Sequence, residues 1–173
     1  DYIYISPLDS MIDDKNVYEY QQANEATLFG GEVGVHYHPH FAHQIHFESS
    51  FSYTEGRLSE DAYPPLIPQP KLNTLIKYEG QREGKIALNN ISIQHQYFLP
   101  QNNIGLNETT SIDYHLVNLG VHLDLNFKWK SQLNFGVRNL LNEEYINHLS
   151  QLKYLGINNP GRNIYIGLKI NIK

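Results

Sequence analysis

The sequence contains no cysteine, which excludes a disulfide framework. It also has no apolar run that approaches the roughly 18–20 residues of a membrane helix. Because only helices and closed barrels satisfy the backbone inside a bilayer, a membrane protein with this sequence must be a β-barrel. The 13 Lys and Arg residues are scattered and outnumbered by 18 Asp and Glu residues, so we expect no nucleic-acid partner.

Motifs that carry catalysis are also missing. There is no nucleophile–base–acid pattern, no Gly-rich phosphate loop and no zinc-protease motif. The adjacent pair Glu143 and Glu144 would point to opposite faces of a strand, which does not suit a catalytic dyad. We therefore expect neither an enzymatic activity nor a cofactor. The length of 173 residues suits one domain.

The closing run of the chain alternates strictly between apolar and polar residues. One face carries Ile164, Ile166, Leu168, Ile170 and Ile172, and the other carries Tyr165, Gly167, Lys169, Asn171 and Lys173. This alternation over about ten residues predicts a β-strand. A strand of a soluble sandwich usually has about five or six residues, whereas a tilted strand needs about 9–11 to cross a bilayer. The length therefore suits a membrane strand, and an edge strand of a soluble sandwich remains the alternative.

The same alternation recurs along the chain. Strand-like segments lie at 2–5, 17–20, 33–37, 45–53, 72–79, 86–93, 117–126 and 133–137. Within 86–93 the apolar residues change phase at Asn89 and Asn90, which predicts a β-bulge. Tyrosine occurs 13 times, and tyrosine suits the aromatic girdles at membrane–water interfaces.

The predicted connections alternate in length. Short ones lie near Pro39, Gly84 and Lys128, and long ones follow Ser6, Glu55, Pro100 and Tyr145. Short turns at one end and long loops at the other are typical of outer-membrane barrels, whose long loops are extracellular. A Greek-key sandwich has no reason to keep this alternation. We predict an all-β fold, an antiparallel transmembrane β-barrel segment of about eight strands, with Trp129 as an interfacial anchor.

Several stretches together resemble the C-terminal part of the β-barrel of a TonB-dependent outer-membrane receptor. They are D-Y-I-Y-I-S-P, V-Y-E-Y-Q-Q-A-N with F-G-G-E-V, Y-P-P-L-I-P-Q-P-K-L-N, V-R-N-L-L-N-E-E-Y and L-G-I-N-N-P-G-R-N-I-Y-I-G-L. The resemblance implies a barrel of about 22 strands around an N-terminal plug, of which this chain supplies about the last eight. The chain opens inside an alternating strand without an initiator Met, so we expect a piece of a longer protein whose plug and TonB-contacting segment lie elsewhere.

Some residues of these motifs have mechanical roles. The motif residues are Gly31, Glu32, Asn139, Asn142, Tyr145, Pro160, Gly161 and Arg162. Gly31 and Gly34 would let a strand bend or the plug approach closely, and an inward Glu32 fits a polar lumen. The Asn and Tyr residues mark a strand end, where side chains satisfy freed backbone groups. The Pro-Gly-Arg segment resets the chain into the closing strand. All of these residues are expected to build the barrel.

Histidines crowd one predicted hairpin. They are His36, His38, His40, His43 and His46. His36 and His38 share a strand face, and His46 on the adjacent strand is a candidate for the same face. Because neutral imidazole binds zinc, copper, iron and nickel, these three form a candidate metal site. The alternative is that a polar lumen simply needs polar residues.

The resemblance implies uptake of an iron–siderophore complex or another metal chelate across the bacterial outer membrane. The partners would be outer-membrane lipid, the TonB complex and the extracellular chelate. Cargo contacts are expected in the long loops, at 9–16, 55–68, 101–109 and 147–159. Two alternatives remain open, a soluble β-sandwich binding module and an outer-membrane barrel enzyme such as a lipase or protease.

Overall fold

The computed structural model describes residues 2–58, 62–81 and 83–171, and its secondary structure is almost entirely β-strand. The strands are β1 (Tyr2–Ile12), β2 (Lys15–Ala23), β3 (Ala26–Tyr37), β4 (Ile45–Leu58), β5 (Lys71–Glu79), β6 (Ile86–Phe98), β7 (Tyr114–Asn126), β8 (Lys130–Arg138) and β9 (Asn163–Ile170). One short 3₁₀ turn, η2 (Lys153–Leu155), interrupts the last loop. In the described ranges, no helix has the length and apolarity needed to span a membrane. Ile172 and Lys173, the predicted end of the closing strand, lie outside the described residues.

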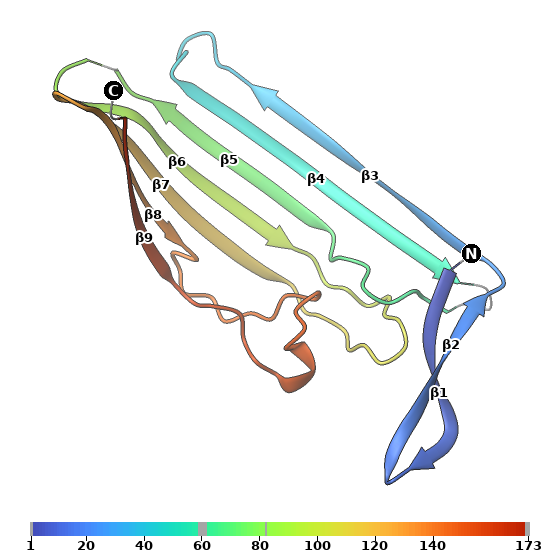
Figure 1. The fold of residues 1–173 in the computed structure, drawn as a ribbon. Coiled ribbons are helices and arrows are strands. Elements are labelled where there is room, and N and C mark those ends of the chain that lie inside the picture. The colour runs from blue at the N-terminus through green and yellow to red at the C-terminus, as the bar shows by residue number, and fades with distance from the viewer. Residues whose placement is uncertain (1, 59–61, 82, 172–173) are drawn as a thin grey trace.

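Strands β3 to β9 form one antiparallel sheet in the order of the sequence, and among the described residues β1 pairs only with β2 (Figure 1). Within the described ranges the edge strands β3 and β9 do not pair with each other, so the sheet is open. Only residues 24–25 separate β2 from β3. Counting these two as one strand gives the predicted number of about eight. The predicted all-β, antiparallel fold is confirmed, and an open sheet of this kind corresponds to part of a barrel wall.

Short and long connections lie at opposite ends of the large sheet (Figure 1). The short ones are residues 38–44, 80–85 and 127–129. The long ones are residues 59–70, 99–113 and 139–162, and the β1–β2 hairpin lies at the same end as these loops. The structure therefore has the predicted alternation for the seven-stranded sheet.

One face of the large sheet is an apolar surface that no other part of the described chain covers. The cross-strand pairs on this face include Val121 with Phe135 and Phe135 with Ile166. Ile166 is 73% exposed and Val33 is 66% exposed. A soluble β-sandwich needs a second sheet over such a face, and the only other sheet among the described residues is the β1–β2 hairpin, which leaves these side chains exposed.

The opposite face is polar, and amide side chains connect its strands. Gln94 on β6 donates to Asn73 on β5 (2.8 Å) and accepts from Asn118 on β7 (3.0 Å). Asn118 in turn accepts from the backbone N–H of Asn139, just beyond β8 (3.0 Å). The amides therefore form a chain of hydrogen bonds that runs from β5 through β6 and β7 to the end of β8. Such bonds satisfy the polar side chains that line a barrel lumen.

The strand register confirms one detail of the sequence prediction and contradicts another. The bulge predicted at Asn89 and Asn90 is confirmed, since the β6–β7 register shifts between Leu88 and Asn90. The long loop predicted after Ser6 is wrong, because β1 continues to Ile12 and pairs with β2 around a tight turn. Proline is tolerated in β1, an edge strand whose register is irregular after Pro7.

The turn between β1 and β2 explains why residues 9–16 form a hairpin. Asp13 and Asp14 have φ values of 50° and 59°. Two consecutive positive φ values define the type I′ geometry that joins twisted strands, and Asp tolerates this conformation. The candidate cargo-contact segment 9–16 is therefore the tip of a hairpin.

Candidate functional site

The three histidines of the candidate metal site meet on the polar face, at the short-turn end of the sheet. His36 lies in β3, His38 directly after it, and His46 near the start of β4. One nitrogen from each ring lies within 4.8 Å of the others. The ring centroids of His36 and His38 are 4.3 Å apart, and those of His38 and His46 are 4.2 Å apart. The three rings therefore lie together on one face of the sheet.

Carboxylates flank this histidine cluster. Nε2 of His36 lies 3.5 Å from Glu48 Oε1, and Nε2 of His46 lies 3.4 Å from Glu79 Oε1. The position of Glu79 is supported by Lys77, whose Nζ is 3.0 Å from the same oxygen. Two carboxylates and one ammonium leave a net negative charge around the rings, which favours a bound cation.

The protonation state of His38 suits metal binding. Partial loss of hydration beside the neighbouring rings, together with the imidazoles of His46 and His36, holds the pKa of the exposed His38 below its ordinary value. A neutral imidazole keeps a free lone pair at neutral pH, and metals bind that form. The other two histidines of the hairpin, His40 and His43, are exposed in the turn and do not belong to the cluster.

In the glycine-rich motif of β3, the backbone of a neighbouring strand approaches Gly30 closely and not the predicted Gly31. A Cβ at Gly31 would meet no described atom within 4 Å, whereas one at Gly30 would lie 2.5 Å from the backbone oxygen of Tyr53. Glu32 pairs with Ser52 and lies on the polar face of the sheet. Close approach of a plug to Gly31 and Gly34 stays a prediction.

The asparagine motif after β8 is an anchor for the longest loop. Oδ1 of Asn139 accepts from the backbone N–H of Glu143 (2.8 Å), and its Nδ2 donates to the Glu143 carbonyl (2.9 Å). Oδ1 of Asn142 accepts from the backbone N–H of Arg162 (2.9 Å). A Cβ at Gly161 would lie 2.7 Å from that same Oδ1. Side chains thus satisfy freed backbone groups here, and glycine at position 161 leaves room for the Asn142 side chain.

Tyr145 belongs to an aromatic stack at the long-loop end of the polar face. Its ring centroid is 4.6 Å from that of Tyr114, which stacks on Phe98 at 4.5 Å. The Tyr114 hydroxyl accepts a hydrogen bond from Asn147 (3.0 Å). Burial raises the pKa of Tyr145. The stack holds the long loop 139–162 against the end of β6 and the start of β7.

A buried histidine that the sequence analysis did not single out ties the long loops together. Nδ1 of His148 is 2.9 Å from Ser111 Oγ and 3.0 Å from Lys153 Nζ. Its Nε2 is buried without a hydrogen-bond partner among the described residues and lies 4.0 Å from Glu108 Oε1. Ser111 is 37 residues away in sequence, so no local pattern could have indicated the contact.

Ser111, His148 and Glu108 have the residue types of a hydrolytic triad but not its accessibility. Ser111 is 6% exposed and His148 is 4% exposed. A nucleophile must reach a substrate carbonyl, and this hydroxyl is enclosed by the loops that it joins. The arrangement fits a loop clamp, in which Gln69 also donates to the carbonyls of Leu99 (2.8 Å) and Ile112 (3.0 Å).

The loop clamp should loosen in acid. Burial, and then the nearby Lys153, lower the pKa of His148, with Glu108 opposing them. The unfolded loop therefore binds the proton more readily, and the stabilisation is complete above about pH 6.5 and is lost as the pH falls below it. We expect hydrogen-exchange protection of residues 139–162 to fall between pH 7.5 and pH 5. A His148→Gln variant should lose this pH dependence, and unchanged protection in the wild type would contradict the assignment.

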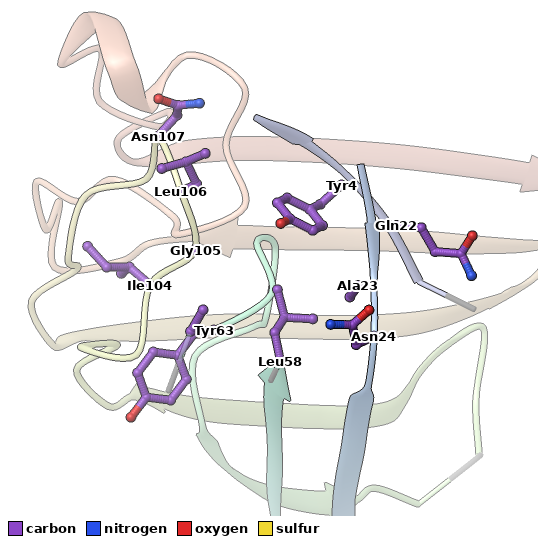
Figure 2. Close-up of a pocket in the computed structure, with 11 residues that line it drawn as sticks. Tyr4, Gln22, Ala23, Asn24, Leu58, Tyr63, Ile104, Gly105, Leu106 and Asn107 are labelled. Atoms are coloured by element: carbon purple, nitrogen blue, oxygen red, sulfur yellow. The ribbon is translucent and has the colours of Figure 1, made fainter. Parts of the chain in front are cut away.

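A pocket of about 620 Å³ lies at the long-loop end, between the β1–β2 hairpin and the loops (Figure 2). Its lining comes from three places in the sequence, the hairpin with the residues after it, the end of β4 with residues 62–63, and the loop segment 104–107. Figure 2 shows Tyr4, Leu58, Tyr63 and Leu106 around this space. Two of the four segments predicted to contact cargo, 55–68 and 101–109, therefore border one pocket.

Comparison with known proteins agrees with this architecture. No protein-family model and no curated relative matches the sequence. A solved structure described as copper transporter OprC is similar, with a TM-score of 0.80 and 21% sequence identity. The match covers 98% of this chain and 27% of that chain. The chain therefore has the fold of a part of that protein's β-barrel and spans about a quarter of its length.

Proposed function

We propose that this chain is the C-terminal part of the β-barrel of a TonB-dependent receptor in the bacterial outer membrane. The observation that carries the proposal is the pairing of an exposed apolar face with a polar face bridged by amides, across seven strands. Outer-membrane barrels place apolar residues toward lipid and polar residues toward the lumen. The alternation of short and long connections supports the same placement, with the long loops outside the cell.

We further propose that the cargo is a metal chelate, such as an iron–siderophore complex. The receptor resemblance supports uptake of a chelate, and the similar solved structure is described as a transporter of copper. The pocket beside Tyr63 and Leu106 lies at the proposed extracellular end, so these residues are candidate cargo contacts. Energy would come from the TonB complex through a plug in another part of the protein.

Growth of a deletion strain tests this function. With iron or copper limiting and supplied as single chelates, the strain should fail to grow on at least one chelate that supports the parent. The intact gene should restore growth on that chelate, and it should not do so in a strain without TonB. Unimpaired growth of the deletion strain on every chelate tried would contradict uptake of a metal chelate, and rescue without TonB would contradict the energy source.

A further inference from the structure

Among the histidine clusters of the described residues, the group at the short-turn end is the one built to hold a cation. We propose that His36, His38 and His46 bind a single divalent transition-metal ion of the borderline class, Cu²⁺, Zn²⁺ or Ni²⁺. Three imidazoles with an open fourth position are a common donor set for these ions. The binding rests on the geometry of the cluster and not on the transport function.

The distances allow the three rings to converge on one ion. Zn–N bonds of about 2.0–2.1 Å in tetrahedral geometry set the nitrogens about 3.3 Å apart. The three candidate ligand nitrogens already lie within 4.8 Å of one another. His46 is the fixed member, since its side chain is 14% exposed, whereas that of His36 is 54% exposed. Small rotations of the exposed rings toward His46 are enough to close the site.

The backbone of the turn fixes the positions from which these rings project. Ala42 N–H donates to the Pro39 carbonyl (3.1 Å), and Ile45 N–H donates to the Ala42 carbonyl (2.9 Å). Glu79 N–H on the neighbouring strand donates to the Gln44 carbonyl (2.7 Å). Because these bonds hold the turn against β5, the cluster is pre-organised, which lowers the entropic cost of binding.

The flanking carboxylates supply the outer contacts that metal-bound histidines usually have. Glu48 and Glu79 each approach Nε2 of one histidine. A carboxylate on one ring nitrogen orients the ring and leaves the other nitrogen for the metal. Nε2 of His46 is buried and makes no hydrogen bond with the described residues. Proton donation from this nitrogen to Glu79, after a small ring rotation, would satisfy it once Nδ1 holds the ion.

Titration of the detergent-purified protein with Zn²⁺ and with Cu²⁺ tests the site. We expect one ion per chain, with Cu²⁺ bound more tightly than Zn²⁺. His38→Gln should weaken binding at least tenfold, and Glu79→Gln should weaken it by about tenfold. His43→Gln is the matched control, since His43 lies in the same turn but outside the cluster. It should bind like the wild type.

The outcomes separate the metal site from a merely polar rim. No binding to the wild type, binding unchanged by His38→Gln, or equal weakening by His43→Gln would each overturn the proposal. Electron paramagnetic resonance of the Cu²⁺-loaded wild type needs no variant to fold. Coupling to several imidazole nitrogens is expected, and its absence would overturn the site. The metal titration does not depend on uptake, so the site and the transport function succeed or fail separately.

Discussion

Ile166→Arg should destabilise the protein in a lipid bilayer by about 2–4 kcal/mol, the cost of an Arg near the bilayer midplane on the outer face of a barrel. Ile166 is 73% exposed in β9 and pairs with Phe135 on the apolar face. On a face bathed by water, the same exposed substitution would change the free energy of unfolding by only about 0.5 kcal/mol. The prediction therefore distinguishes lipid from water as the surroundings of this face.

Gly167→Arg is the matched control for this substitution. Gly167 is the next residue of the same strand and pairs with Asn134 on the polar face. A Cβ at Gly167 would meet no described atom within 4 Å, so an arginine side chain has room. We expect its effect to stay within about 1 kcal/mol, since charge on the lumen face is tolerated.

Folding into lipid vesicles, followed by denaturant titration, measures both variants. The expected result is a large loss for Ile166→Arg and a small change for Gly167→Arg. Equal, small effects would mean that the apolar face does not contact hydrocarbon, and the membrane placement would then be wrong. Equal, large effects would mean that β9 tolerates no arginine on either face, and the assignment of a polar lumen would fail.

The strands could be predicted because lipid and lumen impose opposite demands on alternate residues. The run from Ile164 to Ile170 carries that contrast in its sequence, and β9 has the predicted faces. The bulge at Asn89 could be predicted for the same reason, since a shifted register moves apolar residues to the wrong face. Alternation depends only on residues that are close in the chain, so a single sequence is enough to detect it.

The loops could not be predicted because their contacts join distant positions. Glu108 accepts from the backbone N–H of Leu66, 42 residues earlier, and His148 meets Ser111, 37 residues earlier. Contacts of this kind produce no periodic pattern in the sequence. The β1–β2 hairpin was missed for another reason, because Pro7 indicated a strand end although an edge strand tolerates it.

The histidine cluster could be predicted in part, less fully than the strands and more fully than the loops. Strand alternation placed His36 and His38 on one face, and the cross-strand pairing of His36 with Glu48 brings His46 beside them. The separation of the nitrogens depends on the turn, which the sequence did not specify. The sequence could therefore indicate which residues share the site but not that their rings converge.

Asn139→Ala should lower the free energy of unfolding of the long loop by about 2–5 kcal/mol. Asn139 is 4% exposed and makes two side-chain hydrogen bonds to the backbone of Glu143. Each lost bond costs about 0.5–1.5 kcal/mol. The backbone adds to this, because Asn139 has a φ of 50°, a conformation that costs alanine about 1–2 kcal/mol.

Asn139→Gly separates the two contributions, since glycine adopts a positive φ freely but makes no side-chain hydrogen bonds. We expect hydrogen-exchange protection in residues 139–146 to decrease from the wild type to Asn139→Gly and then to Asn139→Ala. Equal losses in both variants would show that the backbone conformation costs nothing, and no loss in either would show that the loop is not anchored at Asn139. A graded loss would mean that the side-chain hydrogen bonds and the positive φ of Asn139 both anchor the start of the loop. The hydrogen bond from the backbone N–H of Asn139 to Asn118 is kept in both variants and cannot account for the difference.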